Sequence, residues 1–209
     1  MKVADVMNRD VVVVSPRMPL KEVARVLVNR HFSGVPVVDD DGKVLGVVSE
    51  GDILVKERAP GGASSIFGRA LELETWADKH EARDAGGAMT APAVTIGPAR
   101  SVSEAAGLML DRAVNRLPVV DADGKLVGIV TRADLVRAFV RDDSEIAREI
   151  RDDVLLRTLW EAPDSFRVRV RGGEVMLAGK VNDAHAAGTL VRFVERVPGV
   201  VSVRSRISW

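Results

Sequence analysis

The 209-residue sequence predicts an α+β fold, in which a β-α-β-β-α unit occurs twice and a small α-β-β-α-β domain follows. Three observations support this prediction. The first 141 residues contain an internal repeat, each copy holds short Val-rich segments joined by Asp-Gly turns, and the repeat pattern stops near Ser144.

The repeat has a constant offset of 82 residues and no gap. The segment "VPVVDDDGKVLGVVSEGD" returns as "LPVVDADGKLVGIVTRAD". The framework residues of the first copy are Met7, Pro16, Glu22, Pro36, Gly42, Gly46 and Asp52, and those of the second are Met89, Pro98, Glu104, Pro118, Gly124, Gly128 and Asp134. A gapless match of this kind indicates duplication of one structural unit.

Each copy predicts the same order of elements. An extended segment ("VVVVSP" or "AVTIGP") precedes a helix, which shows helical spacing from Leu20 to Val28 and a Ser101–Glu104 capping box in the second copy. Two strands follow, at 35–39 and 44–49 in the first copy, and the last helix covers 50–58 or 132–141. The "DDDG" and "DADG" turns could also be read as calcium loops, but the later ligand positions do not fit, so hairpin turns are the better interpretation.

Both copies place a hydroxyl residue three positions before an acid, where the second strand becomes the last helix. These pairs are Ser49 with Asp52 and Thr131 with Asp134. Such a pair is a helix-capping signature. A helix N-terminus also favours phosphate, and a carboxylate is a good acceptor for the two hydroxyls of a ribose. Capping alone and ligand binding are therefore both open.

With "PVVD-x-(D)G" and "G-h-V-(S/T)-x-x-D" (h apolar) occurring in order twice, the sequence resembles a tandem pair of cystathionine β-synthase (CBS) domains. The resemblance implies domains at 1–58 and 84–141, a homodimer, and an adenosine-type ligand such as ATP, ADP or AMP, with or without Mg²⁺. The residues between the copies predict a linker with a helix at 59–83. No cofactor or metal site is expected. Carried over by position, the ligand-binding residues would be Ser49, Asp52, Thr131 and Asp134 at the ribose and first phosphate, Val14, Val35, Ile96, Leu117 and Pro118 around the adenine, and Arg116 and Arg132 at the phosphates.

The copies differ in charge beside these pairs. The second copy has Arg116 and Arg132 where the first has Gly34 and Glu50. Because a carboxylate repels phosphate, we expect the second copy to form the better nucleotide site.

Residues 144–209 predict a helix with Ser144 as a candidate cap, a hairpin with a Gly172-Gly173 turn, a helix from Asp183 and a last strand. With "GGEVMLAGKV" and "VPGVVSVRSRI", this region resembles a BON domain, a family often proposed to bind phospholipid. Alternation places Arg167, Arg169 and Arg171 on one face of the first hairpin strand, and Arg204 and Arg206 on one face of the last strand. We expect either a solvated face or a contact with anionic phospholipid or a protein partner.

Composition excludes several classes of function. Lys+Arg and Asp+Glu balance at 30 each, so nucleic acid is not an expected partner, and the absence of cysteine excludes disulfides and thiolate catalysis. No signal-like or membrane-spanning run and no catalytic motif appear. We therefore expect a cytoplasmic, non-enzymatic protein, and the resemblance to a CBS pair implies a regulatory protein that senses an adenosine ligand. The alternative is a dimeric scaffold or membrane-surface adaptor whose CBS pair binds no ligand.

Overall fold

The computed structural model describes residues 1–57, 81–158 and 165–209, so the helix predicted in the linker lies outside the described residues. The chain divides into two compact units. The hairpin unit comprises residues 7–99 and 112–130, and the C-terminal unit comprises residues 1–6, 100–111 and 131–209.

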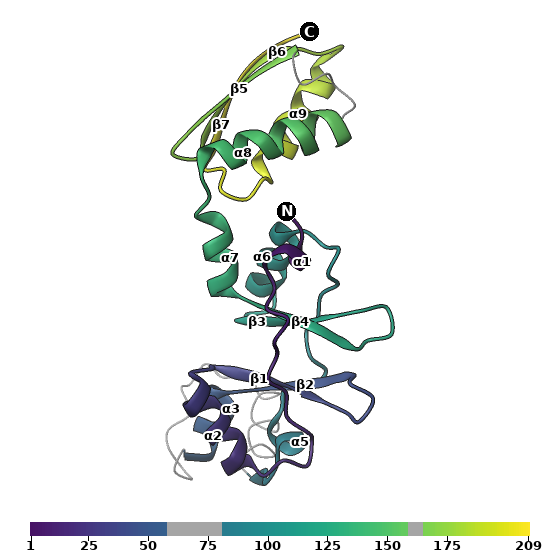
Figure 1. Cartoon of the computed structure of the whole chain (residues 1–209), viewed down its shortest axis with the longest axis vertical. Helices are drawn as coiled ribbons and strands as arrows, with labels where there is room; N and C mark the ends of the chain where they lie inside the picture. The colour runs from purple at the N-terminus through teal and green to yellow at the C-terminus, as the bar shows by residue number, and fades with distance from the viewer. Residues whose placement is uncertain (58–80, 159–164) are drawn as a thin grey trace, which may run out of the picture. The chain divides into compact units, whose positions relative to one another are not determined.

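Four strands form two hairpins, as the repeat predicts (Figure 1). Strand β1 (Gly34–Val38) pairs with β2 (Val44–Ser49), and β3 (Arg116–Val120) pairs with β4 (Leu126–Thr131). In both turns the glycine has a φ of 80°. The side chain of Asp39 accepts a hydrogen bond from the Lys43 amide in the first turn, and Asp121 accepts one from the Lys125 amide in the second. This geometry explains the "DGK" pattern, since glycine adopts positive φ at little cost.

The extended segment that opens each copy is shorter than predicted. Instead of a strand, Val14 forms a single parallel bridge to Val37, and Ile96 forms one to Val119. The chain turns immediately afterwards, where the amide of Met18 donates to the carbonyl of Ser15. The turn begins at the proline that follows the Val-rich run, so the ladder cannot continue past Val14 toward the helix.

The two copies exchange their opening segments within the hairpin unit. Thr90 of the second copy pairs with Val47 in β2, through amide-to-carbonyl bonds of 2.9 and 3.1 Å, and Asn8 pairs likewise with Ile129 in β4. Glycine makes this approach possible. A Cβ on Gly46 would lie 2.7 Å from the Met89 sulfur, and one on Gly128 would lie 2.6 Å from the Met7 sulfur.

The helices of the hairpin unit are α2 (Leu20–Arg30), α3 (Glu50–Glu57) and α5 (Ala85–Ala88). Alternating strand residues and the apolar face of α2 form the core of the first copy, which contains Val14, Val23, Leu27, Val35, Val37 and Val48. These side chains are at most 3% exposed. The spacing that predicted the helix and strands therefore also predicts which side chains form the core.

The C-terminal unit begins with three helices, α1 (Val3–Val6), α6 (Val102–Asp111) and α7 (Arg132–Phe139). The Ser101–Glu104 capping box is confirmed, because the Ser101 amide donates to Glu104 at 2.8 Å and the Glu104 amide donates to the Ser101 hydroxyl at 3.1 Å. Helix α7 begins one residue after Thr131, as predicted.

The remainder of this unit has the predicted α-β-β-α-β order. It comprises α8 (Asp143–Glu149), the π-helical segment η1 (Ile150–Thr158), β5 (Phe166–Arg171), β6 (Glu174–Lys180), α9 (Ala184–Glu195) and β7 (Ser202–Ser208). The sheet order is β5-β6-β7, with β5 antiparallel and β7 parallel to β6. The helices lie along one face of the sheet and enclose an apolar core (Figure 1).

The candidate cap at Ser144 is wrong. Asp142 is the residue that precedes α8, and it makes no side-chain cap bond. The carboxylate of Asp143 instead accepts hydrogen bonds from the amides of Gly172 and Gly173, at 2.7 and 2.9 Å. The hairpin turn, 30 residues away in sequence, thus fixes the start of this helix. Among the described residues, no helix has the length and apolar character that a membrane span requires.

Candidate functional site

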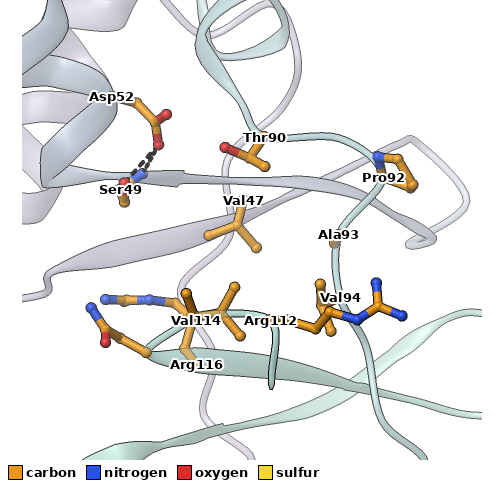
Figure 2. A pocket seen from close by; sticks show the side chains of 12 residues that line it. Val47, Ser49, Asp52, Thr90, Pro92, Ala93, Val94, Arg112, Val114 and Arg116 are labelled. Atoms are coloured by element: carbon orange, nitrogen blue, oxygen red, sulfur yellow. Dashed lines mark hydrogen bonds between the residues drawn. The ribbon is translucent and has the colours of Figure 1, made fainter. Parts of the chain in front are cut away.

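A cavity of about 340 Å³ lies in the hairpin unit, between β2 with the first turn of α3 on one side and segments of the second copy on the other (Figure 2). The first copy contributes Val47, Ser49 and Asp52. The second copy contributes two stretches, Thr90 with Pro92–Val94 and Arg112–Arg116. The exchange of opening segments therefore builds the cavity, because pairing of Thr90 with Val47 brings the following residues to its edge.

Ser49 and Asp52 form one hydrogen-bonded pair at the cavity wall. The amide and the hydroxyl of Ser49 both donate to Oδ2 of Asp52, each at 2.7 Å (Figure 2). The Asp52 side chain is 7% exposed and still faces the cavity. A carboxylate at a helix N-terminus is stabilised by backbone donors, and a carboxylate group as such has several acceptor sites.

Two arginines of the second copy, Arg112 and Arg116, line the same cavity (Figure 2). Arg116 is 8% exposed, and its guanidinium donates to the carbonyl of Gly34 and the hydroxyl of Ser33. Burial lowers the pKa of Arg116, and the Glu50 carboxylate nearby partly offsets this effect. Arg112 is exposed and has no hydrogen bond or ion pair with another described residue.

From the sequence we expect Arg116 beside Thr131, but the structure places Arg116 at the cavity of Ser49 and Asp52 instead. Local sequence could not reveal this, because the neighbour of Arg116 in space is its repeat counterpart, Gly34. Arg112 and the Thr90–Val94 stretch were not predicted at all. A consistent 82-residue offset establishes the repeat, but it carries no information on which copy completes which cavity.

The residues expected around an adenine do not line this cavity. Val14 and Val35 are each 1% exposed and belong to the first copy's core. Ile96 and Leu117 are 7% and 0% exposed, and Pro118 is also buried within β3. The apolar part of the cavity wall comes from Val47, Pro92, Ala93, Val94 and Val114.

Thr131 and Asp134 form a complete capping box at the start of α7. The Thr131 amide and hydroxyl donate to Oδ2 of Asp134 at 2.9 and 2.6 Å, and Oδ1 of Asp134 accepts from Arg137 at 3.1 Å. Arg132 is exposed in the first turn of the helix. The capping interpretation is therefore confirmed for this pair, and ligand binding remains a prediction.

The five arginines of the C-terminal domain lie on one face of its sheet. Strands β5 and β7 do not pair with each other but flank β6 on either side. The register aligns Arg169 with Met176 and Arg204, and Arg167 with Ala178 and Arg206. Arg171 aligns with Glu174, whose carboxylate lies 3.6 Å from the Arg204 guanidinium. All five arginines are exposed.

Comparison with known proteins agrees with this architecture. The CBS domain family model matches residues 3–57 and 82–141, and the BON domain model matches residues 142–209. The chain therefore belongs to the CBS domain family, with a tandem CBS pair followed by a C-terminal BON domain.

Two relatives from Arabidopsis thaliana are CBS domain-containing proteins of the chloroplast. CBSX1 is 34% identical over 141 residues, which cover 63% of this chain and 60% of CBSX1. The crystal structure of CBSX2 in complex with AMP is 35% identical, has a TM-score of 0.58, and covers 66% of this chain and 95% of that one. An uncharacterized protein of Methanocaldococcus jannaschii, MJ1426, is 32% identical over 67% of this chain and 92% of its own length. The chain thus matches about three fifths of the length of the two CBSX proteins.

Proposed function

We propose that this protein is a non-enzymatic cytoplasmic regulator whose CBS pair binds an adenosine-containing ligand, and that the cavity at Ser49 and Asp52 is the principal site. One observation carries the proposal. The buried carboxylate of Asp52 and the exposed side chain of Arg112 line the same cavity of about 340 Å³. A ribose diol suits the carboxylate, and a phosphate suits the Arg112 cation. The AMP complex of CBSX2 supports the ligand class.

The sequence ranked the Thr131 site first, on the basis of Arg116 and Arg132. Because Arg116 lies at the Ser49 cavity, the features that still favour the second site are Arg132 and the lack of a carboxylate at the position of Glu50. We therefore propose the Ser49–Asp52 cavity as the principal site and the Thr131–Asp134 pair as a secondary site.

A thermal unfolding panel tests this function. The full chain is measured with ATP, ADP, AMP, S-adenosylmethionine and NADH, each with and without Mg²⁺. A ligand at about 100 times its dissociation constant adds roughly 2.7 kcal/mol to the stability of the native state. A shift with any adenosine ligand supports the sensor, whereas no shift with the whole panel favours the scaffold alternative.

We further propose a homodimer formed through the helices of both CBS copies. Each copy exposes the same two apolar positions on a pair of contacting helices. Val28 on α2 is 71% exposed and its counterpart Leu110 on α6 is 73% exposed, while Leu54 on α3 and its counterpart Val136 on α7 are 66% and 64% exposed. Large apolar side chains exposed at repeat-related positions suit burial against a second copy.

Light scattering after size-exclusion chromatography tests the dimer. Val28→Glu combined with Leu110→Glu should convert the dimer to a monomer, because dimerisation would bury the new carboxylates. Val140→Glu is the matched control, since Val140 is 79% exposed but its repeat counterpart is Arg58. A monomeric wild-type chain, or a dimeric double variant, contradicts this interface.

The arginine face of the BON domain is the proposed contact with an anionic surface, for which phospholipid headgroups are the first candidate. Neighbouring strands are about 4.8 Å apart, so Arg169 and Arg204 flank β6 at about 10 Å. A flat array of arginines that contains a single carboxylate is complementary to a negatively charged surface. Co-sedimentation with anionic vesicles should weaken in the Arg169→Gln, Arg204→Gln variant and persist in the Arg192→Gln, Arg196→Gln variant, whose two positions are in the last turn and at the C-cap of α9. Equal binding to neutral vesicles contradicts a headgroup contact.

A further inference from the structure

Arg116 joins the two copies at positions that the repeat makes equivalent. Its guanidinium lies over Gly34, its own counterpart 82 residues earlier, and donates to the carbonyl of Gly34 and the hydroxyl of Ser33. A Cβ on Gly34 would lie 2.9 Å from Arg116 Cζ and 2.8 Å from the carbonyl oxygen of Val48. The first copy therefore needs glycine where the second has arginine, because only one of the two positions has room for a side chain.

The acceptors of Arg116 belong to the junction that carries the ligand-facing pair. Gly34 is the register partner of Ser49 in the β1–β2 hairpin. The Ser33 carbonyl accepts a hydrogen bond of 3.1 Å from the amide of Glu50, the first residue of α3. Arg116 is thus linked through Ser33 and Gly34 to the point where β2 ends and α3 begins, which fixes Ser49 and Asp52.

The charge of Arg116 is directed into protein rather than into the cavity. The side chain is 8% exposed, and the carboxylate of Glu50 lies close enough to offset part of the burial cost. A guanidinium stays protonated in proteins, so both hydrogen bonds are charge-assisted. Arg112, at the same cavity, is exposed and has no such bonds with another described residue. The two arginines therefore have different roles.

We propose that Arg116 is a positioning residue, which holds the strand–helix junction of the first copy in place for Ser49 and Asp52, and that it is not a contact to a ligand phosphate. The inference rests on the proposed function for the ligand, but its structural part applies to the free protein. Removal of Arg116 should loosen the first turn of α3 without any ligand. It should also weaken every ligand that uses Asp52, whether or not that ligand carries phosphate.

Hydrogen exchange of the ligand-free full chain is the first test. In Arg116→Gln, amides in the peptide covering the end of β2 and the first turn of α3 should exchange at least about tenfold faster, because a buried charge-assisted bond contributes about 1.5–3 kcal/mol. Arg112→Gln is the matched control and should leave this peptide unchanged. Ser33→Ala removes only one acceptor, keeps the buried charge in place, and should give a smaller acceleration in the same peptide.

Titration calorimetry with adenosine and with AMP is the second test. A positioning role predicts that Arg116→Gln weakens both ligands by a similar factor. A loss of AMP affinity alone, with unchanged exchange in α3, overturns the proposal and makes Arg116 a phosphate contact. If the wild-type chain binds neither compound, the proposed function fails. The exchange measurement then decides the role of Arg116 by itself: faster exchange supports it and unchanged exchange overturns it.

Discussion

Substitution of Gly46 by alanine should disrupt the exchange of segments that builds the cavity. A Cβ at this position would lie 2.7 Å from the Met89 sulfur and 2.8 Å from the carbonyl oxygen of Thr90. The sulfur can move, but the carbonyl belongs to backbone that is paired with Val47 through two hydrogen bonds. Loss of both bonds, at about 0.5–1.5 kcal/mol each, predicts a destabilisation of about 1–3 kcal/mol.

The equivalent substitution in the other copy is a matched comparison. A Cβ on Gly128 would lie 2.6 Å from the Met7 sulfur but 3.1 Å from the carbonyl oxygen of Asn8. Here the flexible side chain causes the main clash. The penalty of Gly128→Ala should therefore shrink in a Met7→Ala background, whereas the penalty of Gly46→Ala should persist in a Met89→Ala background.

Chemical denaturation followed by circular dichroism measures these free energies of unfolding, and two double-mutant cycles isolate the coupling to each methionine. A Gly46→Ala protein within about 0.5 kcal/mol of wild type refutes the reasoning. Equal coupling in the two cycles would also contradict it, because the main clash is with a rigid carbonyl in one copy and with a movable sulfur in the other.

Three further predictions concern the C-terminal unit. Thr131→Ala should lower stability by about 1 kcal/mol in a urea titration, because it removes the hydroxyl of the capping box. A hydrogen bond from the Ser101 amide lowers the pKa of Glu104. The contribution of the ionised Glu104 carboxylate to stability is therefore present above the unfolded-state pKa, and it is lost as pH falls through the folded-state pKa. Melting temperatures between about pH 5 and pH 3 should therefore fall less steeply in Glu104→Gln than in wild type. Arg141→Gln should lower stability by more than about 1.5 kcal/mol, because it breaks a 2.6 Å ion pair with Glu149. Both side chains of this pair are only about one eighth exposed. A urea midpoint equal to that of wild type would count against this prediction.

The sequence predicted what local patterns determine. The Asp-Gly turns predicted both CBS hairpins, and strict alternation predicted that Arg167, Arg169 and Arg171 share a face. The Ser101–Glu104 cap and the helix start at Asp183 also followed from the local sequence, since the bonds that fix both helix starts form between residues within one helical turn.

What the sequence did not predict depends on contacts between distant segments. Arg116 was expected beside Thr131 and lies over Gly34, because the guanidinium finds its acceptors in the other copy. Ser144 was expected to cap α8, but the helix start is fixed by Asp143 and the amides of the Gly172-Gly173 turn. In both cases the residue type was informative, while its partner was decided by tertiary structure.

Calorimetric titration of AMP into wild type, Asp52→Asn and Asp134→Asn tests the central claim most directly. Asparagine keeps the size of the side chain and removes the charge, and Asp134 is the repeat counterpart of Asp52. Loss of charge-assisted hydrogen bonds worth about 1.5–3 kcal/mol should weaken AMP by about 10-fold to 150-fold in Asp52→Asn. Asp134→Asn should keep the wild-type affinity of the principal site. Wild-type affinity in Asp52→Asn would contradict the assignment of the ligand to the Ser49–Asp52 cavity.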